Sequence, residues 1–170
     1  MGEEFGTAEK NLPPIKIVGI GVAVIAVVAL IIAFMQRPQS SASGTIDNVT
    51  AVDIPNQNSV LVAISVSFRN NGQKPYWIKS TKAELDTANG NYTDDGASAV
   101  DFDRYYTAFP TLKENTYPAL ERETKINPGA SIKGTMIVSF PVDQNGFNSR
   151  KALKVIVQPY DQPAPMVLTK

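Results

Sequence analysis

The sequence contains no cysteine and no histidine among its 170 residues. Their absence excludes Ser-His-Asp and Cys-His nucleophilic sites, zinc sites of the usual kind, iron–sulfur clusters and haem bound through either residue. It also excludes disulfides, so a folded domain in this chain must be stabilised by packing. A Ser-x-x-Lys motif is missing as well. We therefore predict that the protein is not an enzyme and binds no cofactor.

An excess of charge is also lacking, because 16 Lys and Arg residues stand against 16 Asp and Glu residues. Three residues of each sign precede residue 38, so the rest of the chain holds 13 of each. A neutral domain has no basic surplus with which to attract phosphate backbones. The sequence therefore predicts no nucleic-acid partner.

What the sequence does contain is an unbroken apolar run from Ile17 to Met35, with Lys16 before it and Arg37 after it. About 20 consecutive apolar residues can cross a bilayer as one helix, which satisfies its own backbone amides. A cleaved signal peptide is the alternative, because small residues follow the run, but the apolar core of a signal peptide is usually about 7–15 residues long. We predict a single transmembrane helix over residues 15–36.

Basic residues near the two ends of this helix predict its orientation. Lys10 and Lys16 precede the run, whereas Arg37 alone follows it closely. This bias favours a cytoplasmic N-terminus and a C-terminal domain in the periplasm or outside the cell. We therefore expect a short cytoplasmic segment at 1–14, a Ser-rich tether at 37–44 and one folded domain at 45–170.

Beyond the tether the hydrophobic pattern changes to a period of two. It is clearest at residues 60–69, where Val, Ile and Phe alternate with smaller or polar side chains, as in a strand with one buried face. Asn-Gly and Pro-Gly pairs mark turns between such segments. The strands are expected at residues 45–54, 60–69, 76–85, 121–126, 132–140, 152–158 and 166–169. About seven short strands at this spacing predict an antiparallel β-sandwich.

Residues 93–118 interrupt the alternation, with a short helix expected near residues 100–108. An insertion of this length either covers a sheet edge or forms a functional loop. Its aromatic residues form a candidate protein-binding surface, with packing as a second small core as the alternative. They are Tyr105, Tyr106, Phe109 and Tyr117.

The same insertion contains four acidic residues, Asp94, Asp95, Asp101 and Asp103. Carboxylates so close in sequence could bind calcium, but their spacing does not match an EF-hand loop, and a solvated acidic loop is the alternative that we favour. We predict no metal site. Trp77, at the start of a strand, is expected to belong to the core.

Three sequence motifs of the domain resemble those of a known family. They are the strand 60–69 running into Asn70-Asn71-Gly72, the Asn89-Gly90 turn after a strand, and the Pro128-Gly129 turn followed by the strand that ends Phe140-Pro141-Val142. This pattern is similar to the telokin-like, immunoglobulin-type extracytoplasmic domains of uncharacterised bacterial membrane-anchored proteins. The resemblance covers about residues 45–169. It implies an immunoglobulin-like β-sandwich that serves as an envelope accessory or binding module, without catalytic residues.

Small residues recur within the apolar run at three-, four- and seven-residue spacings. On a helix they fall along one stripe, and such a stripe allows a second helix to approach closely in lipid. A plain lipid-facing anchor is the alternative. The candidate helix-packing residues are Gly19, Ala23, Ala26 and Ala33.

Two functions therefore stay open. The first is a membrane-anchored binding or scaffolding module for a soluble or envelope ligand. The second is a small accessory subunit of a larger membrane complex, docked through its helix with the sandwich capping an extramembrane face. Both require the lipid bilayer, and both predict other membrane or envelope proteins as partners.

Overall fold

The computed structural model describes residues 15–35 and 40–170. The chain divides into two compact units, residues 1–38 and residues 39–170. The predicted cytoplasmic segment 1–14 and residues 37–39 of the predicted tether lie outside the described residues.

The first unit contains helix α1 (Ile15–Met35), which ends one residue before the predicted boundary. From Lys16 to Met35 its mean hydropathy is 3.1, and its described side chains are exposed. At 1.5 Å per residue the helix is about 30 Å long, which equals the thickness of a bilayer's hydrocarbon core. By length and composition α1 is a candidate membrane span, a test that an N-terminal signal sequence also passes.

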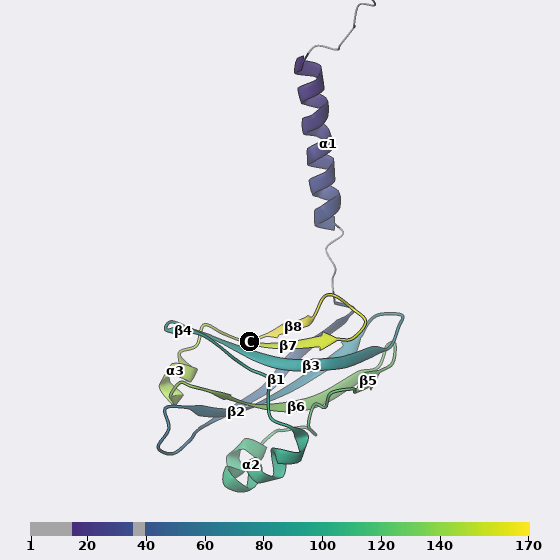
Figure 1. The fold of residues 1–170 in the computed structure, drawn as a ribbon. Helices are drawn as coiled ribbons and strands as arrows, with labels where there is room; N and C mark the ends of the chain where they lie inside the picture. The colour runs from purple at the N-terminus through teal and green to yellow at the C-terminus, as the bar shows by residue number, and fades with distance from the viewer. Residues whose placement is uncertain (1–14, 36–39) are drawn as a thin grey trace, which may run out of the picture. The chain divides into compact units, whose positions relative to one another are not determined.

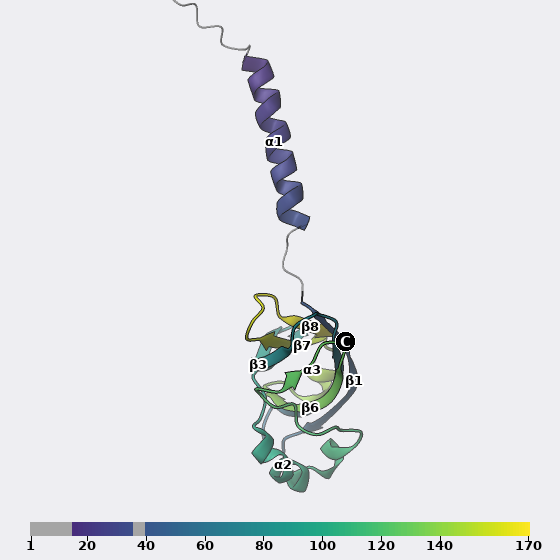
Figure 2. The ribbon, with the colours of Figure 1, turned by 90° about the vertical axis from the view of Figure 1, so that its right-hand side faces the viewer.

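The second unit is built from two antiparallel sheets (Figures 1 and 2). The first sheet has the order β1-β2-β6, and the second has the order β4-β3-β7-β8, with β5 also paired to β3. The strands are β1 (Ala42–Asp53), β2 (Val60–Asn70), β3 (Tyr76–Thr87), β4 (Gly90–Asp94), β5 (Lys125–Ile126), β6 (Ser131–Phe140), β7 (Ala152–Pro159) and β8 (Met166–Thr169). Short helices are η1 (Ala99–Asp101), α2 (Phe102–Ala108), η2 (Pro110–Lys113) and α3 (Gln144–Asn148).

One hydrophobic core is shared by both sheets. Strand β2 supplies Val62 and Ile64, and β7 supplies Val155 and Val157, all fully buried. Each such side chain contributes about 1.5–3 kcal/mol when it is removed from water.

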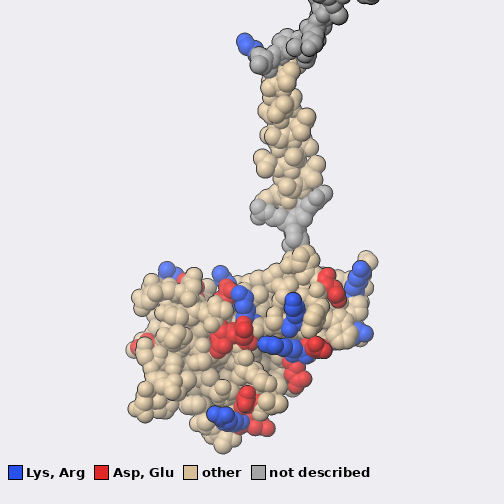
Figure 3. Space-filling model, in the orientation of Figure 1, with Lys and Arg blue, Asp and Glu red and all other residues tan. Residues whose placement is uncertain are grey.

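The surface carries acidic and basic side chains side by side, as Figure 3 shows for one face of the domain. The prediction that the chain combines an N-terminal apolar helix with antiparallel β-sheets is therefore confirmed.

Several local features differ from the sequence-based expectations. Strand β1 begins at Ala42, three residues before the expected start of the domain. The short strand β4 was not expected, and the strand expected at 121–126 is reduced to the two residues of β5. The expected turn at residue 143 instead begins helix α3, because the Asp143 side chain accepts a hydrogen bond from the amide of Gly146 at 2.7 Å.

Strand β2 is buried on both faces, whereas its alternation predicted one buried face. A second, smaller core covers the outer face of the first sheet, where Leu61, Ala63 and Ile137 pack against Phe102 and Leu112. The last two residues belong to α2 and η2, so the insertion folds back over the sheet (Figure 1). Of the two expected roles for the insertion, covering the sheet is the one found.

The chain passes from the first sheet to the second at a corner held by the buried Asn70. Its Nδ2 atom donates to the carbonyl oxygens of Lys74 at 2.8 Å and Ile126 at 3.0 Å. Its Oδ1 atom accepts from the amide of Gly72 at 2.9 Å. The Asn70 backbone also pairs with the turn that follows β5, through the Gly129 amide and the Ala130 carbonyl. One side chain therefore connects β2, the corner and the approach to β6.

We expect Asn70→Ala to lower the free energy of unfolding by about 2–4 kcal/mol, because three backbone groups at the corner lose their hydrogen-bond partner. The measurement is urea denaturation of the full chain in detergent micelles, followed by circular dichroism. Asn71→Ala is the matched control, since Asn71 is exposed and its side chain donates a hydrogen bond to the side chain of Ser43, which is also at the surface. Equal stabilities for the two variants would contradict the role of Asn70.

Candidate functional site

The outer face of the first sheet carries rows of polar side chains that the strand register brings together. Ser43 of β1 pairs with Arg69 of β2, and Arg69 pairs with Ser131 of β6. The next row places Thr45, Ser67 and Lys133 side by side, and a third places Asn48, Ser65 and Thr135 together. Because residues alternate between the faces of a strand, these rows lie opposite the main core.

The third row is covered by the segment that follows η2. Ser65 and Thr135 are fully buried, and their hydroxyl oxygens lie 2.9 Å apart. Ser65 Oγ donates to the carbonyl of Asn115 at 3.1 Å, and Thr135 Oγ1 accepts from the amide of Tyr117 at 2.8 Å. These bonds satisfy the buried hydroxyls and place Tyr117 at the border between the covered and the open half of the face.

The open half forms a shallow groove of about 610 Å³. Its walls come from three strands, β1, β2 and β6, and its lining residues are Ser43, Gly44, Ser67, Phe68, Arg69, Ser131, Ile132 and Lys133. The lining combines serine hydroxyls with two basic side chains. Such a surface offers hydrogen-bond donors to a ligand with carboxylate or other acceptor oxygens.

Neither basic side chain of the groove has a carboxylate within salt-bridge distance. Within residues 15–35 and 40–170 the salt bridge found joins Lys82 to Glu84 at 2.8 Å, on the other sheet. Lys133 Nζ instead lies over the ring of Tyr117, 5.0 Å from its centroid. Arg69 is exposed and lies beside the Pro-Gly turn. Its guanidinium is 3.9 Å from the position that a Cβ atom on Gly129 would take. Two cations therefore remain available to an anionic group.

Asp47 supplies the negative charge at the border of the groove. Its Oδ1 atom accepts hydrogen bonds from Thr45 Oγ1 at 2.8 Å and Ser67 Oγ at 3.0 Å. Desolvation acts to raise the pKa of Asp47, but these hydrogen bonds, a further one from Tyr117 and the charge of Lys133 together lower it below its ordinary value. Asp47 is therefore ionised at neutral pH.

The structure divides the predicted protein-binding residues between two environments. Tyr105, Tyr106 and Phe109 are half-buried and pack against the second core, while Tyr117 borders the groove. The Tyr106 ring meets Phe102 edge to face at 5.8 Å, and its buried hydroxyl has no hydrogen-bond partner within the described part of the chain. These three side chains fasten the insertion to the sheet.

The candidate helix-packing residues lie on one face of α1. Within the first unit, no side chain lies within 4 Å of the position that a Cβ atom on Gly19 would take. Leu30 follows Ala26 by four residues and precedes Ala33 by three, so the stripe of small residues is interrupted by a large one. Among the described residues of the first unit, α1 is the one helix.

Two further expectations concern Asp94 and Trp77. Asp94 accepts hydrogen bonds from the amides of Ser139 and Gly96, and no group of three acidic residues within 15–35 and 40–170 is placed to hold a metal ion. The expectation that Trp77 belongs to the core is wrong, because its side chain is 38% exposed. Its neighbours Tyr76 and Ile78 fill the core and direct Trp77 to the opposite face.

Comparison with known proteins gives no family assignment, since no protein-family model and no curated protein matches the chain. One similar solved structure is a target of the Northeast Structural Genomics Consortium, with 9% identity, a TM-score of 0.42, and coverage of 76% of this chain and 81% of that one. Another is a conserved hypothetical protein from Bacillus anthracis, with 11% identity, a TM-score of 0.42, and coverage of 76% and 88%. The telokin-like assignment therefore stays a resemblance.

Sequence reasoning did not single out Arg69, Lys133 or Asp47. Arg69 and Lys133 occupy the polar positions of two alternating segments, which was a usable signal. What was missing is the pairing of the strands, because only the register places these residues in adjacent rows.

We expect Ser67→Ala and Lys133→Met each to raise the pKa of Asp47, since each removes an interaction that favours the carboxylate. Because this pKa is lower in the folded state than its ordinary 3.8, ionised Asp47 stabilises the fold at higher pH, and the contribution is lost as the pH falls below 3.8 through the folded-state pKa. The measurement is a carbon-13 NMR titration of the carboxyl groups in the full chain. Lys79→Met, on the other sheet, is the control, and an unchanged titration in Ser67→Ala would refute the assignment.

Proposed function

We propose that the protein is a single-pass membrane protein whose immunoglobulin-like β-sandwich acts, without catalysis, as a binding module in the periplasm or outside the cell. The observation that carries the proposal is the groove on the outer face of the first sheet, where Arg69 and Lys133 lack a carboxylate partner in the described residues. The ligand chemistry that fits is an acidic segment of another envelope or membrane protein.

Helix α1 supports the membrane part of the proposal. Ile25 and Leu30 are each 70% exposed, and the other aliphatic side chains that follow Lys16 are also exposed. Leaving one such side chain in water costs about 1.5–3 kcal/mol relative to burial, and α1 carries more than ten of them. A bilayer removes this cost. The basic residues before the helix favour the cytoplasm for the N-terminus and the opposite side for the domain.

The groove supports binding of a carboxylate. An arginine guanidinium pairs with a carboxylate through two parallel hydrogen bonds, which fixes the orientation of the bound group. Lys133 adds a second positive charge in the adjacent row, and serine hydroxyls lie between the two. Electrostatic complementarity of this kind contributes specificity and a faster association rate.

The same residues are poorly suited to catalysis. Among the serines that line the groove, Ser67 is the one that donates to a carboxylate, and its Oγ lies 3.0 Å from Asp47 Oδ1. A general base works best when its pKa is near the ambient pH, whereas the pKa of Asp47 is lowered. The hydrogen bond between Ser67 and Asp47 therefore has a structural role.

The test is a charge reversal in the groove. The double variant Arg69→Glu and Lys133→Glu should reduce recovery of the partner protein about tenfold or more when the full chain is purified from its native membrane in mild detergent. Crosslinking before solubilisation and mass spectrometry identify the partner.

The matched control is Lys79→Glu with Lys151→Glu, two exposed lysines elsewhere on the domain, which changes the net charge by the same amount. Unchanged recovery in the groove variant, with the fold intact by circular dichroism, would refute the proposal. The accessory-subunit alternative is tested by Gly19→Leu with Ala23→Leu, because bulky residues on the small stripe prevent close helix contact. Loss of the partner there, with no loss in the groove variant, would favour docking through the helix.

A further inference from the structure

A second surface of the domain exposes two large aromatic side chains side by side. Trp77 is 38% exposed and Tyr160 is 52% exposed. The amide of Tyr160 donates to the carbonyl of Trp77 at 3.1 Å, so the segment after β7 is fixed beside the start of β3. We call Trp77, Tyr160 and their neighbours Lys125 and Pro75 the Trp77 surface.

The exposure of Trp77 follows from the packing of its neighbours. Tyr76 and Ile78 are fully buried, and the Tyr76 hydroxyl donates to the carbonyl of Val157 at 3.0 Å. This bond fixes the face of β3 that points inward, so the indole must point outward. Lys125 Nζ lies 5.5 Å from the centroid of the Trp77 ring, a cation–π contact.

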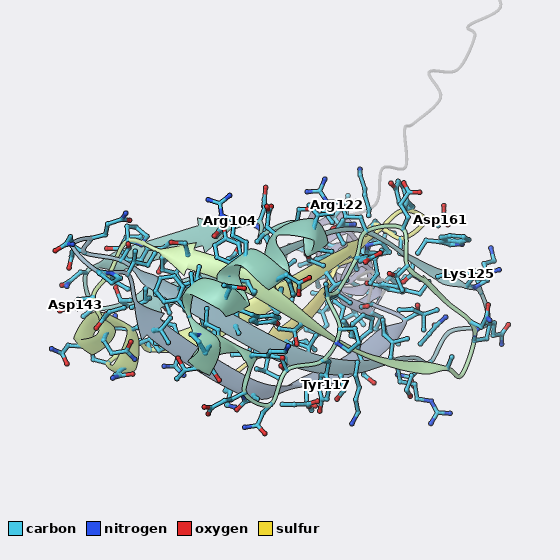
Figure 4. All side chains as sticks on the ribbon, turned by 90° about the horizontal axis from the view of Figure 1, so that it is seen from below. Arg104, Tyr117, Arg122, Lys125, Asp143 and Asp161 are labelled. Atoms are coloured by element: carbon cyan, nitrogen blue, oxygen red, sulfur yellow. The ribbon has the colours of Figure 1, made fainter. Side chains whose placement is uncertain are left out.

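A hollow of about 390 Å³ adjoins the indole. It is lined by Lys74, Pro75, Trp77, Asp161 and Gln162. Charges of both signs surround the aromatic pair. Lys74, Lys125 and Arg122, whose charge acts on the Tyr160 hydroxyl, are the basic residues. Asp161 and Glu123 are the acidic ones, and Glu123 Oε1 accepts a hydrogen bond from the Tyr160 hydroxyl at 3.0 Å. Lys125 and Asp161 lie together at one end of the domain, and Asp143 lies at the opposite end (Figure 4). The surface is therefore aromatic and is bordered by charges of both signs.

The polypeptide reaches the folded domain beside this hollow. The backbone amide and hydroxyl of Ser41 donate to Gln162 Oε1 at 3.2 and 3.0 Å, and Gln162 also lines the hollow. The Ser41 carbonyl accepts from the amide of Asn71 at 2.8 Å, so this position is held from two sides. Ser41 is the sixth residue after Met35, the end of α1. Six residues span at most about 20 Å.

We propose that the Trp77 surface lies in the headgroup layer of the bilayer that α1 crosses. The short connection keeps the Ser41 side of the domain within reach of the membrane surface, and the exposed aromatic pair is on that side. Tryptophan and tyrosine are enriched at the membrane–water interface, where an apolar ring and a polar tip are both accommodated. Charges of both signs fit the zwitterionic headgroups of phosphatidylcholine. This inference rests on the proposed membrane anchoring, and it is independent of the groove.

The chain provides its own probe, because Trp77 is its single tryptophan. The full chain is reconstituted into phosphatidylcholine nanodiscs, with and without lipids that carry a nitroxide on the headgroup. We expect the nitroxide to quench Trp77 fluorescence and the emission to lie at a shorter wavelength than that of the same chain in urea. The nitroxide is attached to the lipid, so quenching reports contact with lipid, and a scaffold protein without tryptophan leaves Trp77 as the single tryptophan in the sample.

The matched control moves the probe to the other end of the domain. In the variant Trp77→Phe with Asn145→Trp, the new tryptophan occupies an exposed position on α3, beside Asp143. We expect weak quenching there. Equal quenching at the two positions would overturn the inference.

Size-exclusion chromatography of the same samples distinguishes a failure of the membrane anchor from a failure of the headgroup contact. A chain that elutes with the nanodiscs but shows no quenching of Trp77 contradicts the headgroup contact and leaves the membrane anchor in place. A chain that separates from the nanodiscs contradicts both.

Discussion

The hydrogen bonds of the Asn70 side chain are the interaction on which the arrangement of this domain depends. Asn70 ends β2, and its amide group joins the carbonyl oxygens of Lys74 and Ile126, which belong to the corner and to β5. A buried amide is costly unless it is paired, so the three bonds allow one geometry of the corner and disfavour others. That geometry sends β3 into the second sheet, and it aligns the turn before β6 with the end of β2.

With β6 aligned in this way, the register of the first sheet determines what its outer face can do. Small side chains at Ala63 and Ser65 leave room for the insertion, which covers that half of the face with Phe102 and Leu112. The other half carries Arg69 and Lys133, and polar side chains there do not favour an apolar cover. One face of one sheet thus contains both a second core and an open polar groove, and Tyr117 marks the border.

The sequence predicted the strands well because burial on one face leaves a period of two. It did not predict β4, since Gly90–Asp94 has little apolar content and is held by pairing with β3 rather than by burial. It also did not predict that β2 is buried on both faces. The alternation of Val and Ser is compatible with a solvent-exposed outer face, and only the packing of another segment buries that face. The groove needed the register of three strands, which local periodicity does not contain. The aromatic insertion was recognised from composition, but composition did not separate the three side chains that anchor it from Tyr117.

The groove and the Trp77 surface are linked through one residue of the corner. Asn71 donates its backbone amide to the Ser41 carbonyl, next to the hollow, and its Nδ2 atom to Ser43 Oγ, in the groove wall, at 2.7 Å. Both bonds come from a turn that Asn70 holds in place, so the two surfaces keep a fixed relation to each other within the domain. If the Trp77 surface rests on lipid, a ligand in the groove is held close to the membrane. An acidic segment of a neighbouring membrane protein, near the point where that protein leaves the bilayer, meets this requirement better than a freely diffusing ligand does.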